Sequence, residues 1–280
     1  MKNVSIKDFA IGTEEPLCLF LGPCALESKE LAFEVAHFIK EATQNKNCNV
    51  VFKSSFDKAN RSSFSSKRGL GMEAGLQVLS DIKQALGFPI VTDIHLPDQA
   101  KPVAEVCDVL QIPAFLCRQT DLILAAARTG RVIKVKKGQF VAPWDMAQAV
   151  DKIRSCGNER ILLTERGTMF GYNNLVSDMR SIPIMQSLGV PVCFDASHSV
   201  QLPGAQGTES GGERIYIKSL AKAAIAMGAN SLFVECHPCP DNAISDKASQ
   251  LPLEELPAFL DEVLALYALT QSFSNLGAQA

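Results

Sequence analysis

The stretch VVFKSSFDKANRSS, residues 50–63, starts as a short apolar β-strand and ends as a dense run of polar side chains. An apolar strand whose polar groups gather at one end is typical of a scaffold that presents a binding site there. Lysine supplies a compact positive charge and arginine a planar pair of donors, so we expect this end to bind an anion. A solvated loop is the alternative. The polar residues are Lys53, Ser55, Asp57, Lys58, Asn60, Arg61 and Ser62.

The same order of a short apolar run, a polar loop and an amphipathic helix recurs along the whole chain. Leu31, Val35 and Ile39 follow the helical period of 3.6 residues in the first such helix. Glycines such as Gly87 and Gly130 mark the helix ends, where a left-handed residue is often needed. The strands that we expect are 17–21, 50–53, 90–93, 109–112, 132–135, 161–164, 192–195 and 231–235, and their nearly continuous apolar character is typical of a parallel sheet covered on both faces.

Eight strand–helix units in 280 residues predict an α/β protein with one closed (β/α)8 TIM barrel, so we expect residues 1–280 to form a single catalytic domain. An open, doubly wound sheet is the second interpretation. We expect residues 3–12, a short N-terminal extension, to form a hairpin over the barrel's N-terminal mouth. The glycine-rich segment 202–213 is either an ordinary mobile loop or a lid over the site.

Composition narrows the class of partner and the compartment. The formal net charge is −3, without a cluster of Lys and Arg, so we expect no nucleic-acid partner. The first apolar run, 16–21, is too short for a signal peptide or a membrane span, so we expect no membrane association and a cytoplasmic location. Nine cysteines without a repeating spacing suit a reducing compartment.

The carboxyl end of every expected strand carries a polar or reactive residue, whereas the amino ends begin almost entirely with apolar residues. In a (β/α)8 barrel the active site is built from the loops at the carboxyl ends. This asymmetry predicts a shared site on that face. The residues at these ends are Cys24, Lys53, Asp93, Gln111, Lys136, Arg166, His198 and Glu235.

The polar residues at this face fall into two chemical groups. The cations Lys53, Lys58, Arg61, Lys136 and Arg166 are enough to bind more than one phosphate or carboxylate. Thiol, imidazole and carboxylate groups together suit a divalent transition metal such as Zn, Fe(II), Mn or Co. The expected metal ligands are Cys24, His198, Glu235 and Asp246.

The motif Cys236-His237-Pro238-Cys239 is a tempting redox or zinc motif, but we discount it. Glu235 and Cys236 are consecutive on a strand, so their side chains point to opposite faces. If Glu235 reaches the barrel mouth, Cys236 faces the helices. The role of His95 stays open between a site residue and a loop residue, and its neighbour Asp93 is the better candidate.

Seven segments, covering nearly the whole chain, resemble the 3-deoxy-D-manno-octulosonate 8-phosphate synthases. The most specific is KANRSS, within residues 52–63; the related synthases of the aromatic pathway have a Pro-Arg-Thr pattern there that is absent here. The others are TDIH (92–95), QIPAFLCRQTDL (111–122), KVKKGQF (134–140), ERGTMFGYNNLVSDM (165–179), FDASHSVQLPG (194–204) and ECHPCPDNAISD (235–246).

The resemblance implies an enzyme that condenses phosphoenolpyruvate with D-arabinose 5-phosphate and releases inorganic phosphate, in lipopolysaccharide precursor synthesis. It implies that Lys53 and Ser55 bind the phosphoenolpyruvate carboxylate. Its phosphate would be bound by Lys58, Lys136 and Arg166 with the backbone of Ala114, and the pentose phosphate by Asn60, Arg61 and Ser62, with Asp93 and Gln111 nearby. The family is tetrameric, so Phe115 and Arg118 would reach a neighbouring subunit's site.

The family contains metal-dependent and metal-independent members, and the latter carry Asn where this chain has Cys24. The resemblance therefore implies a required divalent metal, with Lys53, Asp93, Lys136 and His198 as catalytic residues. Three alternatives stay open: a synthase that uses erythrose 4-phosphate, a Schiff-base aldolase that uses Lys136 or Lys53, and a non-catalytic phosphosugar-binding barrel.

Overall fold

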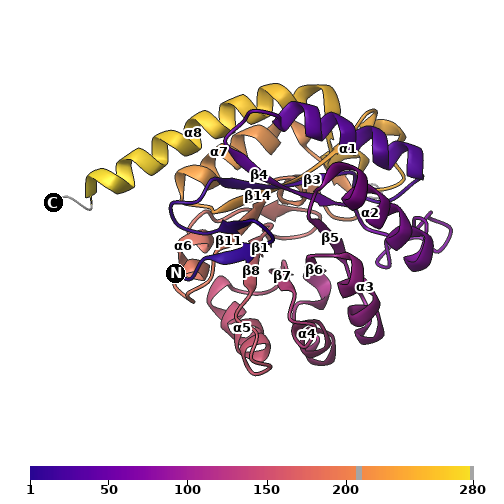
Figure 1. The fold of residues 1–280 in the computed structure, drawn as a ribbon, viewed down its shortest axis with the longest axis horizontal. Helices are drawn as coiled ribbons and strands as arrows, with labels where there is room; N and C mark the ends of the chain where they lie inside the picture. The colour runs from indigo at the N-terminus through magenta and orange to yellow at the C-terminus, as the bar shows by residue number, and fades with distance from the viewer. Residues whose placement is uncertain (206–209, 278–280) are drawn as a thin grey trace.

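A computed structural model of the protein describes residues 1–205 and 210–277. Eight parallel strands form a barrel (Figure 1), and it closes because β14 pairs with β11 on one side and with β3 on the other. The barrel strands are β3 (Leu17–Gly22), β4 (Cys48–Lys53), β5 (Ile90–Asp93), β6 (Val109–Ile112), β7 (Val132–Lys136), β8 (Ile161–Glu165), β11 (Val192–Asp195) and β14 (Ser231–His237).

Helices surround the barrel, each following a strand in the chain (Figure 1). They are α1 (Lys29–Thr43), α2 (Met72–Leu86), α3 (Ala100–Val106), α4 (Thr120–Ala127), α5 (Ala147–Arg154), α6 (Ser181–Gln186), α7 (Ile217–Ala226) and α8 (Leu256–Gly277). Short 3₁₀ helices are η1 (Pro97–Gln99), η2 (Ala114–Leu116), η3 (Pro143–Met146), η4 (His198–Val200), η5 (Arg214–Tyr216), η6 (Pro240–Asn242), η7 (Lys247–Ser249) and η8 (Leu253–Glu255).

The strands predicted from the sequence are confirmed, and the open doubly wound sheet is wrong. Five of the eight strands extend one or two residues beyond the expected bounds; β4 begins two residues earlier, at Cys48, and β14 continues two residues further, to His237. A two-residue strand, β15 (Leu251–Pro252), pairs with this extension of β14. The extension matters because it places Glu235 inside a regular strand and not at its last residue.

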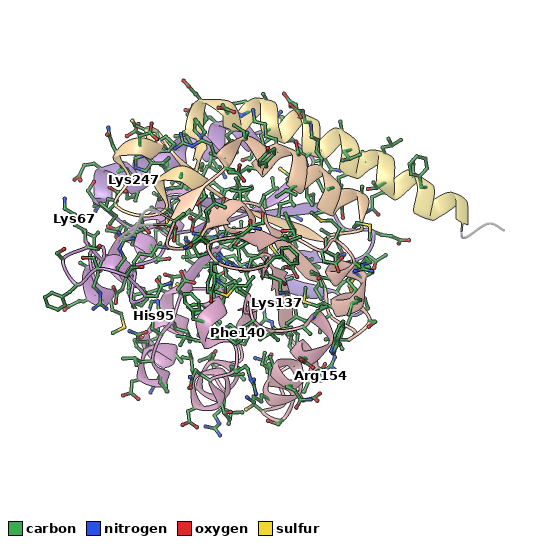
Figure 2. The ribbon with its side chains drawn as sticks, turned by 180° about the vertical axis from the view of Figure 1, so that it is seen from behind. Lys67, His95, Lys137, Phe140, Arg154 and Lys247 are labelled. Atoms are coloured by element: carbon green, nitrogen blue, oxygen red, sulfur yellow. The ribbon has the colours of Figure 1, made fainter. Side chains whose placement is uncertain are left out.

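Side chains alternate between two apolar layers. One face of the strands packs against the helices, and Cys236 belongs to this outer core, as predicted. The other face fills the barrel with residues such as Phe20 and Phe233. Figure 2 shows side chains filling the space between the strands and the outer helices.

The N-terminal extension closes one mouth of the barrel. Strands β1 (Val4–Ile6) and β2 (Phe9–Ile11) form the expected antiparallel hairpin. Val4, Ile6 and Ile11 are buried in the same apolar cluster as the barrel interior. Because this end is plugged by apolar side chains, the opposite mouth is the one open to ligands.

A glycine at the end of β3 brings two site segments together. Gly22 has a φ of +152°, and a Cβ at this position would lie 2.0 Å from the carbonyl oxygen of Lys53. Only glycine tolerates so close an approach of backbone to backbone. The loop that carries Cys24 can therefore cross directly over the end of β4.

Two short antiparallel strand pairs lie at the open mouth. They are β9 (Thr168–Met169) with β10 (Leu175–Val176), and β12 (Gln201–Leu202) with β13 (Gly211–Gly212). The expected lid, 202–213, contains residues 206–209, which lie outside the described residues. Within residues 1–205 and 210–277, no helix combines the length and hydrophobicity needed to cross a bilayer.

Candidate active site

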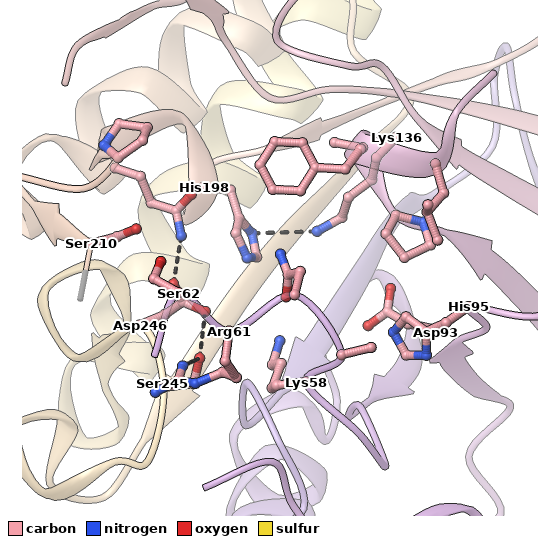
Figure 3. A pocket seen from close by; sticks show the side chains of 18 of the residues that line it. Lys58, Arg61, Ser62, Asp93, His95, Lys136, His198, Ser210, Ser245 and Asp246 are labelled. Carbon is pink, nitrogen blue, oxygen red and sulfur yellow. Dashed lines mark hydrogen bonds between the residues drawn. The ribbon is translucent and has the colours of Figure 1, made fainter. Parts of the chain in front are cut away.

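A cavity of about 480 Å³ opens at the carboxyl ends of the barrel strands (Figure 3). Its wall comes from the loop after β4, the ends of β5 and β7, and the segments after β6, β8, β11 and β14. These segments are distant in sequence and meet because parallel strands end on the same face. The shared site predicted at this mouth of the barrel is thus present as one cavity.

Five cations line the cavity: Lys58, Arg61, Lys136, Arg166 and Lys247. The pKa of Lys58 is raised well above its usual value, because Cys24, Glu235, Asp246 and Asp93 together outweigh the opposing effect of burial. Arg166 is 3% exposed, and its Nη1 has no hydrogen-bond partner among the described residues. A cavity with this lining is suited to small molecules that carry several negative charges.

The fifth predicted cation lies deeper than the cavity. Lys53 is 1% exposed, and its Nζ lies 2.5 Å from Oε1 of Glu235 and 2.8 Å from the carbonyl oxygen of Cys24. Burial alone would raise the pKa of Glu235, but the charges of Lys53, His198 and Lys58 lower it to about 2. Glu235 is therefore an ionised carboxylate under the cavity floor.

A thiol and two carboxylates form a compact cluster beside this pair. Ligand atoms of Cys24, Glu235 and Asp246 lie within 4.8 Å of one another, and Cys24 Sγ donates to Asp246 Oδ2 at 2.9 Å. Burial, together with the charges of Asp246 and Glu235, raises the pKa of the Cys24 thiol. The thiol is thus protonated unless a cation joins the cluster, because a metal ion favours the thiolate.

His198 lies next to this cluster, although its ring is not among the three closest groups. Its Nδ1 faces Asp195, and its Nε2 lies 3.7 Å from Glu235 Oε2, an oxygen without a hydrogen bond among the described residues. A sulfur ligand, two carboxylates and an adjacent imidazole fit a divalent transition metal. The donor set therefore fits the ion expected from the sequence.

Asp195 is a site residue that the sequence analysis did not single out. Its carboxylate is fully buried and contacts both Lys136 Nζ, at 2.8 Å, and His198 Nδ1, at 2.8 and 3.0 Å. Burial opposes ionisation, but the charges of His198 and Lys136 lower the pKa of Asp195 well below its usual value. The sequence did contain a signal for Asp195, because this residue is the last one of β11 and so lies at a carboxyl end of the barrel.

The floor of the cavity contains another ionised carboxylate, Asp93. Asp93 Oδ1 accepts a hydrogen bond from Gln111 Nε2 at 2.7 Å, and Oδ2 accepts one from Ser55 Oγ. Burial would raise the pKa of Asp93, but Lys53, Lys58 and Lys136 lower it far below the usual value. Asp93 lines the cavity, whereas Gln111 and Ser55 lie fully buried beneath it.

Gln201 connects the cation set to the acidic cluster and was also missed. Its Oε1 accepts from Arg166 Nη2, and its Nε2 donates to Asp246 Oδ1, each at 2.5 Å. Gln201 lies in the segment FDASHSVQLPG (194–204), but a glutamine carries no charge that would single it out for this link.

The cavity gathers most of the predicted site residues. Those that line it are Lys58, Asn60, Arg61, Ser62, Asp93, Ala114, Phe115, Lys136, Arg166, His198 and Asp246. Cys24, Lys53, Ser55, Gln111 and Glu235 are buried and make the contacts described above. Arg118 is exposed and does not belong to the lining of this cavity. The open question of His95 is settled in part: it lines the cavity, and burial lowers its pKa.

Comparison with known proteins identifies the class. A sequence model of the DAHP synthetase I family matches residues 2–271. The chain therefore belongs to the DAHP synthetase I family. The barrel fold is consistent with this family, whose named relatives are aldolase or synthase enzymes.

Three relatives carry the name 2-dehydro-3-deoxyphosphooctonate aldolase. The protein of Nitratidesulfovibrio vulgaris (strain DP4) is 61% identical over 90% of this chain and 92% of its own length. The protein of Protochlamydia amoebophila (strain UWE25) is 54% identical over 97% and 98%, and that of Brucella canis is 54% identical over 94% and 95%. The resemblance seen in the sequence segments is thereby confirmed.

Proposed function

We propose that this protein condenses phosphoenolpyruvate with D-arabinose 5-phosphate and water to give 3-deoxy-D-manno-octulosonate 8-phosphate and inorganic phosphate. The observation that carries the proposal is the lining of one cavity by Lys58, Arg61, Lys136 and Arg166. Two phosphates and a carboxylate must share that cavity, and four cations can offset their mutual repulsion. The name of the relatives, which span almost the whole chain, supports the same reaction.

Bond formation joins C3 of phosphoenolpyruvate to the aldehyde carbon of the open-chain sugar. The enol electrons form the new C–C bond, and the aldehyde oxygen takes up a proton. Water adds to the electron-poor C2 and loses one proton, which balances the proton taken up by the aldehyde oxygen. The new C2 hydroxyl then loses its proton as the C2–O bond to phosphate breaks, so C2 becomes a ketone and phosphate leaves with the electron pair and that proton. Holding both reactants aligned can lower the barrier by several kcal/mol, on the order of the gain from proximity in intramolecular reactions.

We assign different residues to different parts of the two substrates. We assign the phosphate of phosphoenolpyruvate to Lys136, Arg166 and Lys58, and the pentose phosphate to Arg61 with Asn60 and Ser62. The Arg166 Nη1 without a partner supports the first assignment. Lys53 and Ser55, to which the resemblance assigns the carboxylate of phosphoenolpyruvate, lie below the cavity and would support that carboxylate from beneath. The ionised Asp93 is suited to accept a hydrogen bond from a sugar hydroxyl.

A divalent transition metal (Zn, Fe(II), Mn or Co) would be held by Cys24, His198, Glu235 and Asp246. When bound, such an ion polarises a carbonyl oxygen or lowers the pKa of water. Asp195 fixes the His198 ring through Nδ1 and so leaves Nε2 directed toward Glu235. Lys136, which shares the Asp195 carboxylate, stays next to the imidazole.

Phosphate release measured with each sugar tests the proposal. The protein is assayed with phosphoenolpyruvate plus either arabinose 5-phosphate or erythrose 4-phosphate, with and without a chelator. We expect release with arabinose 5-phosphate and a loss of activity in chelator that added divalent metal reverses. Faster release with erythrose 4-phosphate, or none with either sugar, would overturn the proposal. Borohydride trapping of a covalent adduct would favour the Schiff-base alternative.

The oligomeric state and location follow from the same proposal. Large apolar side chains are exposed at the open mouth, among them Phe115, Phe140, Phe170 and Tyr172, and such groups often mark subunit contacts. We propose a cytoplasmic homotetramer in which residues 1–280 form one catalytic domain; nine free thiols suit that compartment. Light scattering of the purified protein tests the tetramer, and a monomeric mass would contradict it.

A further inference from the structure

Lys134, on β7, carries an ammonium group into the interior of the barrel, where branched apolar side chains are the usual filling. Its side chain is 0% exposed. Its Nζ lies 5.0 Å from the ring centroid of Phe20 and 4.8 Å from that of Phe233, so the charge sits over two aromatic rings. Lys134 does not line the cavity, and no role in binding has been assigned to it above.

A line of hydrogen bonds connects Lys134 to the cavity floor. Lys134 Nζ donates to Gln111 Oε1 at 2.9 Å, and Gln111 Nε2 donates to Asp93 Oδ1 at 2.7 Å. Lys134 and Gln111 are both fully buried, whereas Asp93 lines the cavity. Lys134 therefore contacts the site through a single intervening side chain.

The orientation of the Gln111 amide decides whether Asp93 faces a hydrogen-bond donor or an acceptor. One end of a primary amide donates and the other accepts. With a donor fixed at Oε1, the nitrogen must point to Asp93. If the amide turned over, its oxygen would face Asp93 Oδ1, and neither of these two oxygens would have a donor there, which costs free energy.

We propose that Lys134 is a positioning residue for the part of the site that binds the aldose phosphate: it fixes the Gln111 amide so that Asp93 keeps its hydrogen-bond donor and stays directed toward a hydroxyl of the sugar. The inference rests on the proposed function. It adds a residue whose effect is indirect, through Gln111 and not through contact with either substrate.

The energetics of Lys134 support a functional reason for its presence. Among residues 1–205 and 210–277, no carboxylate forms an ion pair with it within 4.0 Å. Burial, the main cause, lowers its pKa to about 8; Cys193 and Asp195 on β11 and Asp93 on β5 oppose this, and Lys136 on the same strand adds to it. A side chain that is unfavourable to bury is expected where function compensates for it.

The test replaces the ammonium by an uncharged side chain of similar length, Lys134→Met, and uses Lys101→Met as a matched control on the exposed face of α3. For Lys134→Met we expect kcat/KM for arabinose 5-phosphate to fall roughly 10-fold to 100-fold, as for loss of a hydrogen bond that orders a charged group. We expect KM for phosphoenolpyruvate to change by less than about twofold, since its proposed ligands are untouched. Lys101→Met should match the wild type.

A double-mutant cycle with Gln111→Met decides whether Lys134 acts through Gln111. We expect Lys134→Met to have almost no further effect in the Gln111→Met background. A full, additive loss in that background, or a Lys134→Met enzyme with unchanged sugar kinetics, would overturn the inference. If Lys134→Met does not fold, the same cycle with Lys134→Gln gives the same decision. An inactive wild type would instead reject the proposed function, so the two failures are distinguishable.

Discussion

Lys136 Nζ lies 2.8 Å from Oδ2 of Asp195, and the ring of His198 contacts the same carboxylate. One buried negative charge thus orients a cation of the phosphate set and the imidazole beside the acidic cluster. The two positive partners explain why the pKa of Asp195 lies so far below its usual value despite complete burial. Asp195 is therefore the shared counter-charge of Lys136, which belongs to the cation set, and of His198, which lies beside the acidic cluster.

Replacing Asp195 by Asn keeps the shape of the side chain but removes the charge. We expect kcat/KM to fall roughly 100-fold and the metal affinity to fall by about 10-fold to 100-fold, which is typical of a lost partner behind a metal-binding histidine. Steady-state rates and the metal content of the purified protein measure the two effects. Asp261→Asn on α8 is the control, since this carboxylate is 68% exposed. A variant with wild-type rate and metal content would show that Asp195 does not hold His198.

Replacing Cys24 by Ser tests the proposed metal centre directly. A serine hydroxyl is a poor ligand for the softer divalent metals that a thiolate binds. We expect less bound metal and activity more than about tenfold lower, on the scale that single ligand-shell changes produce. Cys239→Ser, which changes an exposed thiol, should have neither effect. A Cys24→Ser enzyme that keeps full activity in chelator would rule out the metal requirement.

Replacing Gln201 by Met separates Arg166 from Asp246 with little change in volume. Both hydrogen bonds of the amide are lost, so Arg166 is free to leave the cavity wall. We expect KM for phosphoenolpyruvate to rise about tenfold, whereas KM for arabinose 5-phosphate changes little, because Arg61 is tied separately to Ser245 and Ile244. Initial-rate measurements with each substrate varied in turn test this. Equal changes in both KM values would argue against a local role.

The barrel could be predicted from the sequence because its signals are local. Each strand is a short apolar run, and glycines such as Gly87 and Gly130, with φ of 77° and 71°, mark the following turns. The residues at the strand ends could also be predicted, since the topology alone brings Lys136 and Arg166 to one mouth. These predictions needed only periodicity and the rule that parallel strands end together.

The specific side-chain contacts within the site could not be predicted in the same way. The link from Arg166 through Gln201 to Asp246 depends on side-chain directions at three distant positions. The depth of Lys53, paired with Glu235 below the cavity, depends on where each strand ends relative to its neighbours. Lys134 belongs to the expected strand 132–135, and only the structure shows that its ammonium group lies inside the barrel, over Phe20 and Phe233.

The buried charge of Lys134 should appear in the pH dependence of stability. Its pKa is about 8 in the folded protein and about 10.4 in an unfolded chain. Below pH 8 both states carry the charge, and the unfavourable burial is fully present. Between about pH 8 and 10.4 the unfolded state binds more protons, so the free energy of unfolding rises with pH relative to a variant without this group.

We therefore expect the difference in unfolding free energy, wild type minus Lys134→Met, to rise by about 3 kcal/mol between pH 7 and pH 10.5. Denaturant unfolding at a series of pH values measures it, and taking the difference cancels the titration of groups that both proteins share. Lys101→Met gives the control, because an exposed lysine has nearly the same pKa in both states. A difference that stays flat with pH would mean that Lys134 is not buried as an ammonium, and its place between Phe20 and Phe233 would need another explanation.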